Sequence, residues 1–309
     1  MFNFYKQENG KIKQTQFYSK NCWINVTDPS TEEIEKLKKD YLVPEEFIED
    51  ILDIDERART EISGRWLMIV LRVPVYVANN DFSFFTVPLG VLISANSVIT
   101  LCDRENEIIN DIIEGKIKGF DIENRHNFIL YLFQLSATYY LRFMKIIVRR
   151  TNQIEKDIRK SIENSQLNML LVIQKTLVYF MTSLKSNEML LAKLQRAKYV
   201  DNEQLDEELL EDVVIENKQA FETATIHSEI LTGMMDAFAS VISNNLNLVM
   251  KRLTIITICV MIPSIFSGLF GMNVPNSSEA NPYTFWFVIG ASITIPALVV
   301  LTFKRLRWL

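Results

Sequence analysis

Two long apolar runs near the C-terminal end constrain this chain more than any other feature of its sequence. Residues 253–270 and residues 283–303 contain no Asp, Glu, Lys or Arg. The hydrocarbon core of a bilayer is ~30 Å thick, so a helix needs about 20 apolar residues to cross it. Two such runs in succession are not typical of helices buried in a soluble core. We therefore predict a C-terminal hairpin of two transmembrane helices, over residues 253–271 and residues 283–303.

The charged residues around the two runs predict their orientation. Lys251 and Arg252 precede the first run and the tail at residues 304–309 is basic, whereas the loop at residues 272–282 holds Glu279 and no Lys or Arg. Cytoplasmic flanks of membrane helices are enriched in Lys and Arg. We expect a multi-pass protein of the cell membrane with both termini in the cytoplasm and an extracellular loop. The formal net charge of −5 argues against nucleic-acid binding, which requires clustered cations.

One face of the first apolar run carries small, hydroxyl, amide or thioether side chains at alternating steps of three and four residues. This set, here called the stripe, is Asn247, Met250, Thr254, Thr257, Met261, Ser264, Gly268 and Gly271. Such spacing keeps side chains on one side of a helix. The stripe suits the lumen of a pore or close helix packing through small residues. Its extension below the apolar run and its mixture of Met with Thr favour a lumen, which two helices alone cannot enclose.

Residues 1–122 have the texture of an α+β domain. Pro, Gly and Asn punctuate short runs rich in β-branched and aromatic residues, and these predict the strands of a mixed sheet. The expected strands are residues 22–26, 66–77, 84–87, 89–94 and 97–101, and the expected helices are residues 30–41 and 44–53. The sequence has no P-loop, GxGxxG, nucleophile elbow or HExxH motif, so an enzyme is the least favoured class of function.

The middle of the chain predicts long helices. No Pro occurs between Pro88 and Pro263, and after Gly119 the only Gly before Gly268 is Gly233. We expect a helical hairpin over residues 123–204 and a stalk helix over residues 205–271 that continues into the first transmembrane helix. Seven acids stand at the junction: Asp201, Glu203, Asp206, Glu207, Glu208, Glu211 and Asp212. They suit a solvated helix start, where acids favour the helix dipole, or a cation site between copies of the chain.

The first apolar run ends in the tripeptide Gly271-Met272-Asn273, directly before the polar loop. In this position the tripeptide resembles the signature of the CorA-type magnesium transporter family. The resemblance continues at residues 23–26, 49–51, 247–254 and 304–309, and it covers nearly the whole chain. It implies a funnel-shaped homopentamer that conducts Mg²⁺, with Co²⁺ or Ni²⁺ as further cargo, through a pore lined by the first span.

The resemblance also implies roles for individual residues. Asn273 would form an outer ring that meets the hydrated ion, with Gly271 and Met272 shaping the turn. The pore-lining set would be Asn247, Met250, Leu253, Thr254, Thr257, Met261, Ser264 and Gly268, with the gate at Met250, Leu253 and Met261. Two departures from the family pattern are Phe270, where Tyr is usual, and Pro275, where some relatives carry an acid. They leave Glu279 as the one acid of the loop.

The same resemblance implies a regulatory Mg²⁺ held between subunits by Asp50 and Asp212, with Glu49 as a further ligand candidate. The leading hypothesis is thus a passive Mg²⁺ channel that closes when cytoplasmic Mg²⁺ binds, with membrane lipid, divalent cations and further copies of the chain as partners. A zinc transporter of the same family is a close alternative, although the stripe holds no His or Cys. A membrane-anchored scaffold or sensor that does not conduct is the alternative from another class.

Overall fold

The computed structural model describes residues 1–8, 10–19, 21–77, 83–95, 97–117, 119–158, 164–196, 206–272 and 283–306. These residues divide into two compact units, Met1–Thr232 and Gly233–Leu309. Each unit is described here by itself. One helix, α6, belongs to both of them.

Within the described residues, the first unit contains one sheet of seven strands in the order β2-β1-β3-β7-β6-β5-β4. The strands are β1 (Phe2–Glu8), β2 (Lys11–Thr15), β3 (Trp23–Thr27), β4 (Arg59–Ser63), β5 (Trp66–Val77), β6 (Ser83–Ile93) and β7 (Val98–Cys102). β3 and β7 are parallel, and the other neighbours are antiparallel. The sheet is therefore mixed, as the sequence predicts for this α+β domain.

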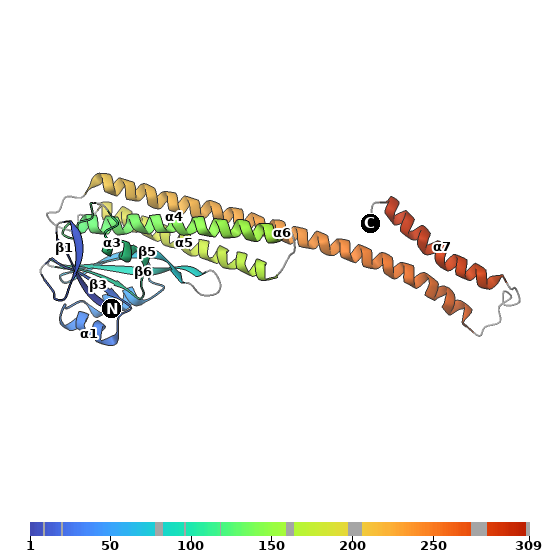
Figure 1. The fold of residues 1–309 in the computed structure, drawn as a ribbon, viewed down its shortest axis with the longest axis horizontal. Coiled ribbons are helices and arrows are strands. Elements are labelled where there is room, and N and C mark those ends of the chain that lie inside the picture. Colours follow the sequence, from blue (N-terminus) through green and yellow to red (C-terminus); the bar gives the residue numbers. More distant parts are fainter. Residues whose placement is uncertain are drawn as a thin grey trace. The chain divides into compact units, whose positions relative to one another are not determined.

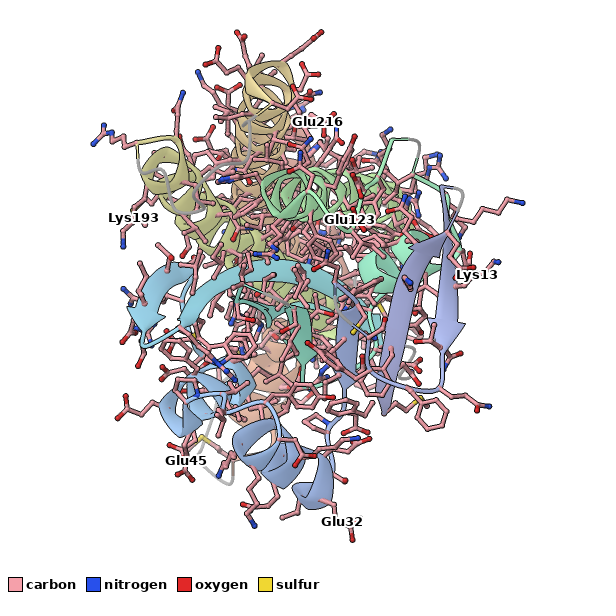
Figure 2. The ribbon with its side chains drawn as sticks, turned by 90° about the vertical axis from the view of Figure 1, so that its left-hand side faces the viewer. Lys13, Glu32, Glu45, Glu123, Lys193 and Glu216 are labelled. Atoms are coloured by element: carbon pink, nitrogen blue, oxygen red, sulfur yellow. The ribbon has the colours of Figure 1, made fainter. Side chains whose placement is uncertain are left out.

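Helices cover both faces of the sheet (Figure 1). On one face lie α1 (Thr31–Lys39) and α2 (Glu45–Leu52), and α2 contacts β6 and β7. On the other face, α4 (Arg125–Ile158) and α5 (Asn164–Arg196) contact β5 and β6, and α3 (Glu107–Ile113) packs on α4. Figure 2 shows Glu45 of α2 and Glu216 of α6 (Glu207–Phe270) on opposite sides of the sheet.

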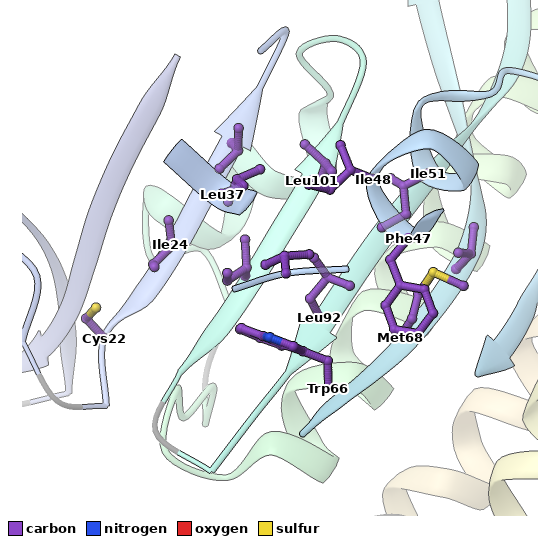
Figure 3. Packing of buried hydrophobic residues seen from close by; sticks show 14 of the residues in the cluster. Cys22, Ile24, Leu37, Phe47, Ile48, Ile51, Trp66, Met68, Leu92 and Leu101 are labelled. Atoms are coloured by element: carbon purple, nitrogen blue, oxygen red, sulfur yellow. The ribbon is translucent and has the colours of Figure 1, made fainter. Parts of the chain in front are cut away.

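The core beneath α1 and α2 brings α2 unusually close to the sheet. Leu37, Phe47, Ile48 and Ile51 pack on strand residues such as Met68, as Figure 3 shows. Gly90 of β6 makes this approach feasible, because a Cβ at Gly90 would lie 2.3–2.7 Å from three side-chain carbons of Ile51. Because Gly90 has no side chain, α2, the helix that carries Asp50, can pack directly on the sheet.

Asn187 of α5 replaces a missing strand beside β5. β4 covers β5 only as far as Val70, so the next backbone groups on that side need other partners. The Asn187 side chain accepts a hydrogen bond from the Arg72 N–H (2.9 Å) and donates one to the Arg72 carbonyl (2.8 Å). Ser136 and Tyr140 of α4 donate to the same carbonyl, each at 3.2 Å. Both long helices are therefore hydrogen-bonded to β5 at one residue.

The prediction of two strands separated at Pro88 is wrong, because β6 runs through this residue. Pro88 lies opposite Arg72, whose backbone bonds to Asn187 instead. On the other side, β7 ends opposite Leu89, so no strand neighbour requires a Pro88 N–H. Pro is tolerated in a strand where its nitrogen faces no ladder partner. The sequence analysis also missed β1, β2, β4 and α3.

The second unit contains the end of α6 and α7 (Thr284–Arg305). Within the described residues, α5, α6 and α7 are long and apolar enough to cross a membrane, by length and composition. In α5, however, Thr176 and Ser183 donate hydrogen bonds to Phe84 and Thr86 of β6. Of its apolar window 39% is buried, whereas the windows of α6 and α7 are 6% and 0% buried. We therefore assign α5 to the folded domain.

The junction at Asn187 gives a stability prediction. Asn187→Leu keeps the number and branching of the side-chain heavy atoms but leaves the partly buried Arg72 N–H without its partner, and an unsatisfied group costs about 1–3 kcal/mol where it is buried. We expect the midpoint of thermal unfolding of the full chain in detergent to fall accordingly. Asn168→Leu, at an exposed position of α5, is the matched control and should leave the midpoint nearly unchanged. Equal midpoints for the two variants would contradict the structural role of Asn187.

Candidate functional site

The stripe lies on the exposed side of α6. Each of its members, from Asn247 to Gly271, is exposed in the single chain, and so is Leu253. The partly buried residues of the same segment form another set, Ile255, Ile258, Cys259, Ile262, Pro263 and Phe266. At about 100° per residue, the two sets point to opposite sides of the helix.

The second set is the side of α6 that packs on α7. The Cys259 thiol lies 4.0 Å from the Pro296 carbonyl of α7, and Ile255 is the most deeply buried residue of this segment. α7 is partly buried at Val288, Ala291 and Val299 along its own matching face. The stripe is therefore not the seam of the hairpin, and packing of α6 on α7 does not explain it.

The hydroxyl groups of the stripe are arranged to offer oxygen lone pairs. Thr254 and Thr257 donate to the carbonyls of Met250 and Leu253 at 2.9 Å, and Ser264 donates to the Val260 carbonyl at 3.1 Å. Each hydroxyl proton is thus engaged by the helix itself. A hydroxyl also has two acceptor lone pairs, which remain available to water or a hydrated cation beside the stripe.

The structure describes the residues beyond one end of the stripe but not those beyond the other. At the C-terminal end, the Gly271 N–H donates to the Ser267 carbonyl at 2.9 Å, and Met272 is exposed. Asn273 and Glu279 lie outside the described residues. At the other end, the same steps of three and four lead back from Asn247 to Ser243, Ser240 and Asp236, all exposed. The sequence analysis stopped at Asn247, although the spacing alone would have found Asp236, an acid on the same face.

Asp50 belongs to a cluster centred on an arginine. It lies in the last turn of α2, and its carboxylate pairs with the Arg59 guanidinium. Arg59 also pairs with Glu56 (Nε to Oε1, 2.6 Å) and with Glu61. Burial alone would lower the pKa of Arg59, but the three carboxylates outweigh burial and raise it. Asp50 keeps 33% of its side chain exposed, and Glu49 beside it is exposed, so ions in solution can reach both.

Asp212 lies on an exposed side of α6, one turn before Glu216. Burial raises the pKa of the Glu216 carboxyl, and the charge of Asp212 adds to the rise. α2 and α6 lie on opposite sides of the sheet (Figure 2), so one chain does not bring Asp50 and Asp212 together. Among the described residues, no group of three or more His, Cys, Asp or Glu side chains could hold a metal ion. A shared ion would therefore require a second copy of the chain.

These features define a class of membrane protein in which an α+β domain is joined through one long helix to a two-helix hairpin. The sequence from residue 18 to residue 305 matches the family described as CorA-like Mg²⁺ transporter protein. The chain belongs to this family, which is one of transporters and not of enzymes.

Individual relatives match over nearly the whole chain. The "Cobalt/magnesium transport protein CorA" of Methanocaldococcus jannaschii is 28% identical, over 93% of this chain and 91% of the relative. The protein of the same name from Thermotoga maritima is 22% identical, over 93% and 83%. The complete structure of the CorA magnesium transporter from M. jannaschii superposes with a TM-score of 0.82 at 23% identity, over 100% of this chain and 99% of that one. The likeness in structure shows the shared fold.

The two faces of α6 give a prediction about access of water. In a Cys259→Ser background, Thr257→Cys and Ser264→Cys on the stripe should react with a water-soluble thiol reagent much faster than Ile258→Cys and Ile262→Cys, which face α7. The remaining cysteines give a low background, since Cys22 and Cys102 are each 1% exposed. Burial also raises the pKa of Cys102 to about 11. Equal rates on the two faces in lipid vesicles would contradict a water-lined stripe.

Proposed function

We propose that this chain is the subunit of a passive Mg²⁺ channel of the cell membrane, with both termini in the cytoplasm. The observation that carries the proposal is the stripe on α6, which is exposed and faces away from α7 in a chain of this family. A scaffold that used the stripe only to pack its own hairpin would bury it against α7. Copies of the chain would enclose the lumen by bringing their stripes together, and the family resemblance indicates five copies.

The chemistry of the stripe suits a hydrated divalent cation. Mg²⁺ gives up its water reluctantly, so a pore for it should offer oxygen atoms to the hydration shell and not a tight cage. The hydroxyl oxygens of Thr254, Thr257 and Ser264, with the amide of Asn247, supply such acceptors without a fixed charge that would trap the ion. Asn273 would supply a further ring of amide oxygens at the outer mouth. Mg²⁺ is here the cargo, and Co²⁺ or Ni²⁺ would use the same acceptors.

The gate would be the apolar part of the same face. Met250, Leu253 and Met261 are all exposed in the single chain, at 52%, 54% and 59%. If several copies surround a narrow lumen, rings of these side chains exclude water and block ions until the helices separate. The membrane potential then drives entry, at about 4.6 kcal/mol per 100 mV for a divalent ion.

Regulation would come from cytoplasmic Mg²⁺ bound between Asp50 of one subunit and Asp212 of the next, with Glu49 nearby. Carboxylate oxygens are hard ligands of the kind that Mg²⁺ prefers. The exposed acids at the start of α6 would repel the acids of a neighbouring subunit unless a cation lies between them. An ion that binds only the closed arrangement shifts the equilibrium by its difference in affinity for the two states.

A zinc transporter of the same family is the second candidate. Zinc prefers His and Cys ligands. Neither residue occurs in the stripe, and Cys259 faces α7. This placement of Cys259 favours Mg²⁺ over zinc as the cargo.

Ion flux tests the proposed function. Wild-type protein in liposomes should take up Mg²⁺ in response to an inside-negative potential, in preference to Zn²⁺. Asn273→Ala should lose most of this uptake, because it removes the amide ring at the mouth. Asn276→Ala, three residues further along the same loop, is the matched control and should conduct normally. No divalent flux would refute the channel, and preference for Zn²⁺ would favour the second candidate.

Channel closure tests the regulatory part. Asp212→Lys should abolish inhibition of flux by Mg²⁺ on the cytoplasmic side, because a lysine ammonium cannot ligate the ion and repels it. Glu211→Lys makes the same charge change at the adjacent exposed position and should retain inhibition. An unchanged Mg²⁺ dependence in Asp212→Lys would refute the assignment of Asp212.

A further inference from the structure

Arg59 is the centre of an ion-pair cluster in the first unit. Its guanidinium lies among three carboxylates that come from three neighbouring segments. Asp50 is in α2, Glu56 is in the connection after α2, and Glu61 is in β4. Each of the three guanidinium nitrogens pairs with a different carboxylate. The arginine fork supplies donors in fixed directions, so this arrangement is specific and not a single surface ion pair.

The backbone around Arg59 is held in place on both sides. The Ala58 N–H donates to the Ser186 hydroxyl of α5 at 3.0 Å, and Lys193 of α5 donates to the Thr60 carbonyl at 3.3 Å. The Glu56 carbonyl accepts from the Arg72 guanidinium at 2.9 Å. The backbone at Arg59 is therefore held in place by its neighbours, and the side chain is the part of this residue that can change partners.

Asp50 is the partner that Arg59 shares with the proposed regulatory ion. Arg59 pairs with one carboxylate oxygen of Asp50. A divalent ion at the other oxygen would lie close to the guanidinium, and like charges repel strongly at such distances. The ion and the arginine thus compete for Asp50. Glu56 and Glu61 remain as partners of Arg59 when it leaves Asp50, so displacement breaks one ion pair out of three.

We propose that Arg59 is a built-in competitor of the regulatory divalent cation at Asp50, and that this competition sets the cytoplasmic Mg²⁺ concentration at which the channel closes. The inference rests on the proposed function, because it requires the Mg²⁺ site at Asp50. Arg59 acts as a tuning residue and does not touch the transported ion. With Arg59 on Asp50, the charge of the Asp50 carboxylate is countered from within the subunit. As cytoplasmic Mg²⁺ rises, the ion displaces the guanidinium towards Glu56 and Glu61 and joins the subunits.

The expected effect is moderate because the cluster is partly exposed, with 37% of Arg59 and 33% of Asp50 open to solvent. Exposed ion pairs of this kind change an equilibrium by up to about fivefold. Arg59→Gln should therefore lower the Mg²⁺ concentration for half-maximal closure by about two- to fivefold in liposomes that contain the full chain. Arg57→Gln removes the same charge two residues away, at an exposed position, and should leave the threshold unchanged.

A conservative variant separates competition from a structural role. Arg59→Lys keeps a cation beside Asp50 but loses the planar fork that pairs with three carboxylates at once, so the threshold should stay near the wild-type value. A threshold lowered in Arg59→Lys as far as in Arg59→Gln would overturn the proposal, as would an unchanged or raised threshold in Arg59→Gln alone.

Two further measurements keep the test decisive. If Arg59→Gln does not fold, Glu61→Gln replaces it, because loss of one alternative partner should keep Arg59 on Asp50 and raise the threshold. A lowered or unchanged threshold in Glu61→Gln would overturn the proposal. Failure of the proposed function appears differently, as absence of divalent flux or of Mg²⁺-dependent closure in the wild type. Normal flux and closure with no effect of the cluster variants would refute only the role of Arg59.

Discussion

The hydrogen bonds between Asn187 and the Arg72 backbone hold the layers of the first unit together. They satisfy β5 where β4 no longer covers it, and they attach α5 to the sheet at a defined register. The Arg72 guanidinium extends the same junction, because it donates to the carbonyls of Ile54 and Glu56 (2.6 and 2.9 Å) in the connection after α2. α5 in turn accepts a hydrogen bond from Asn217 of α6 at its Leu184 carbonyl (3.1 Å). The Arg59 cluster and the start of α6 are thus both connected by hydrogen bonds to the junction of α5 and β5.

A helix or strand could be predicted from the sequence where its own residues show the pattern typical of that element. β5 and β7 are rich in β-branched and aliphatic residues, and the sequence predicts both. β4, with the sequence RTEIS, is polar and pairs only along one edge, so its strand conformation comes from β5 and not from its own pattern. Pro88 led to the wrong prediction of two separate strands for the opposite reason. Its local signal is real, but Arg72 opposite it bonds to Asn187 instead, and β7 ends before it on the other side, so no strand neighbour needs a Pro88 N–H.

The candidate site divides in the same way. The stripe could be found from spacing alone because one helix carries all of it, and the same steps reach Asp236. The side of α6 that packs on α7 required the structure, since Cys259 and Ile262 look no different in sequence from their lipid-facing neighbours. Arg59 could not be identified from sequence, because its partners come from three elements that only the fold brings together. The polar face and the acids of the stalk can thus be found from the sequence alone, whereas the cations that pair with acids cannot.

The two units share the helix α6, which carries Asp212 in the first unit and the stripe in the second. The boundary between the units falls at Gly233, within the continuous helix. No neighbouring atom lies within 4 Å of a Cβ placed at Gly233, so packing does not exclude a larger residue. Gly in a helix interior costs about 1 kcal/mol relative to Ala, and the helix is therefore locally weakened where the units join.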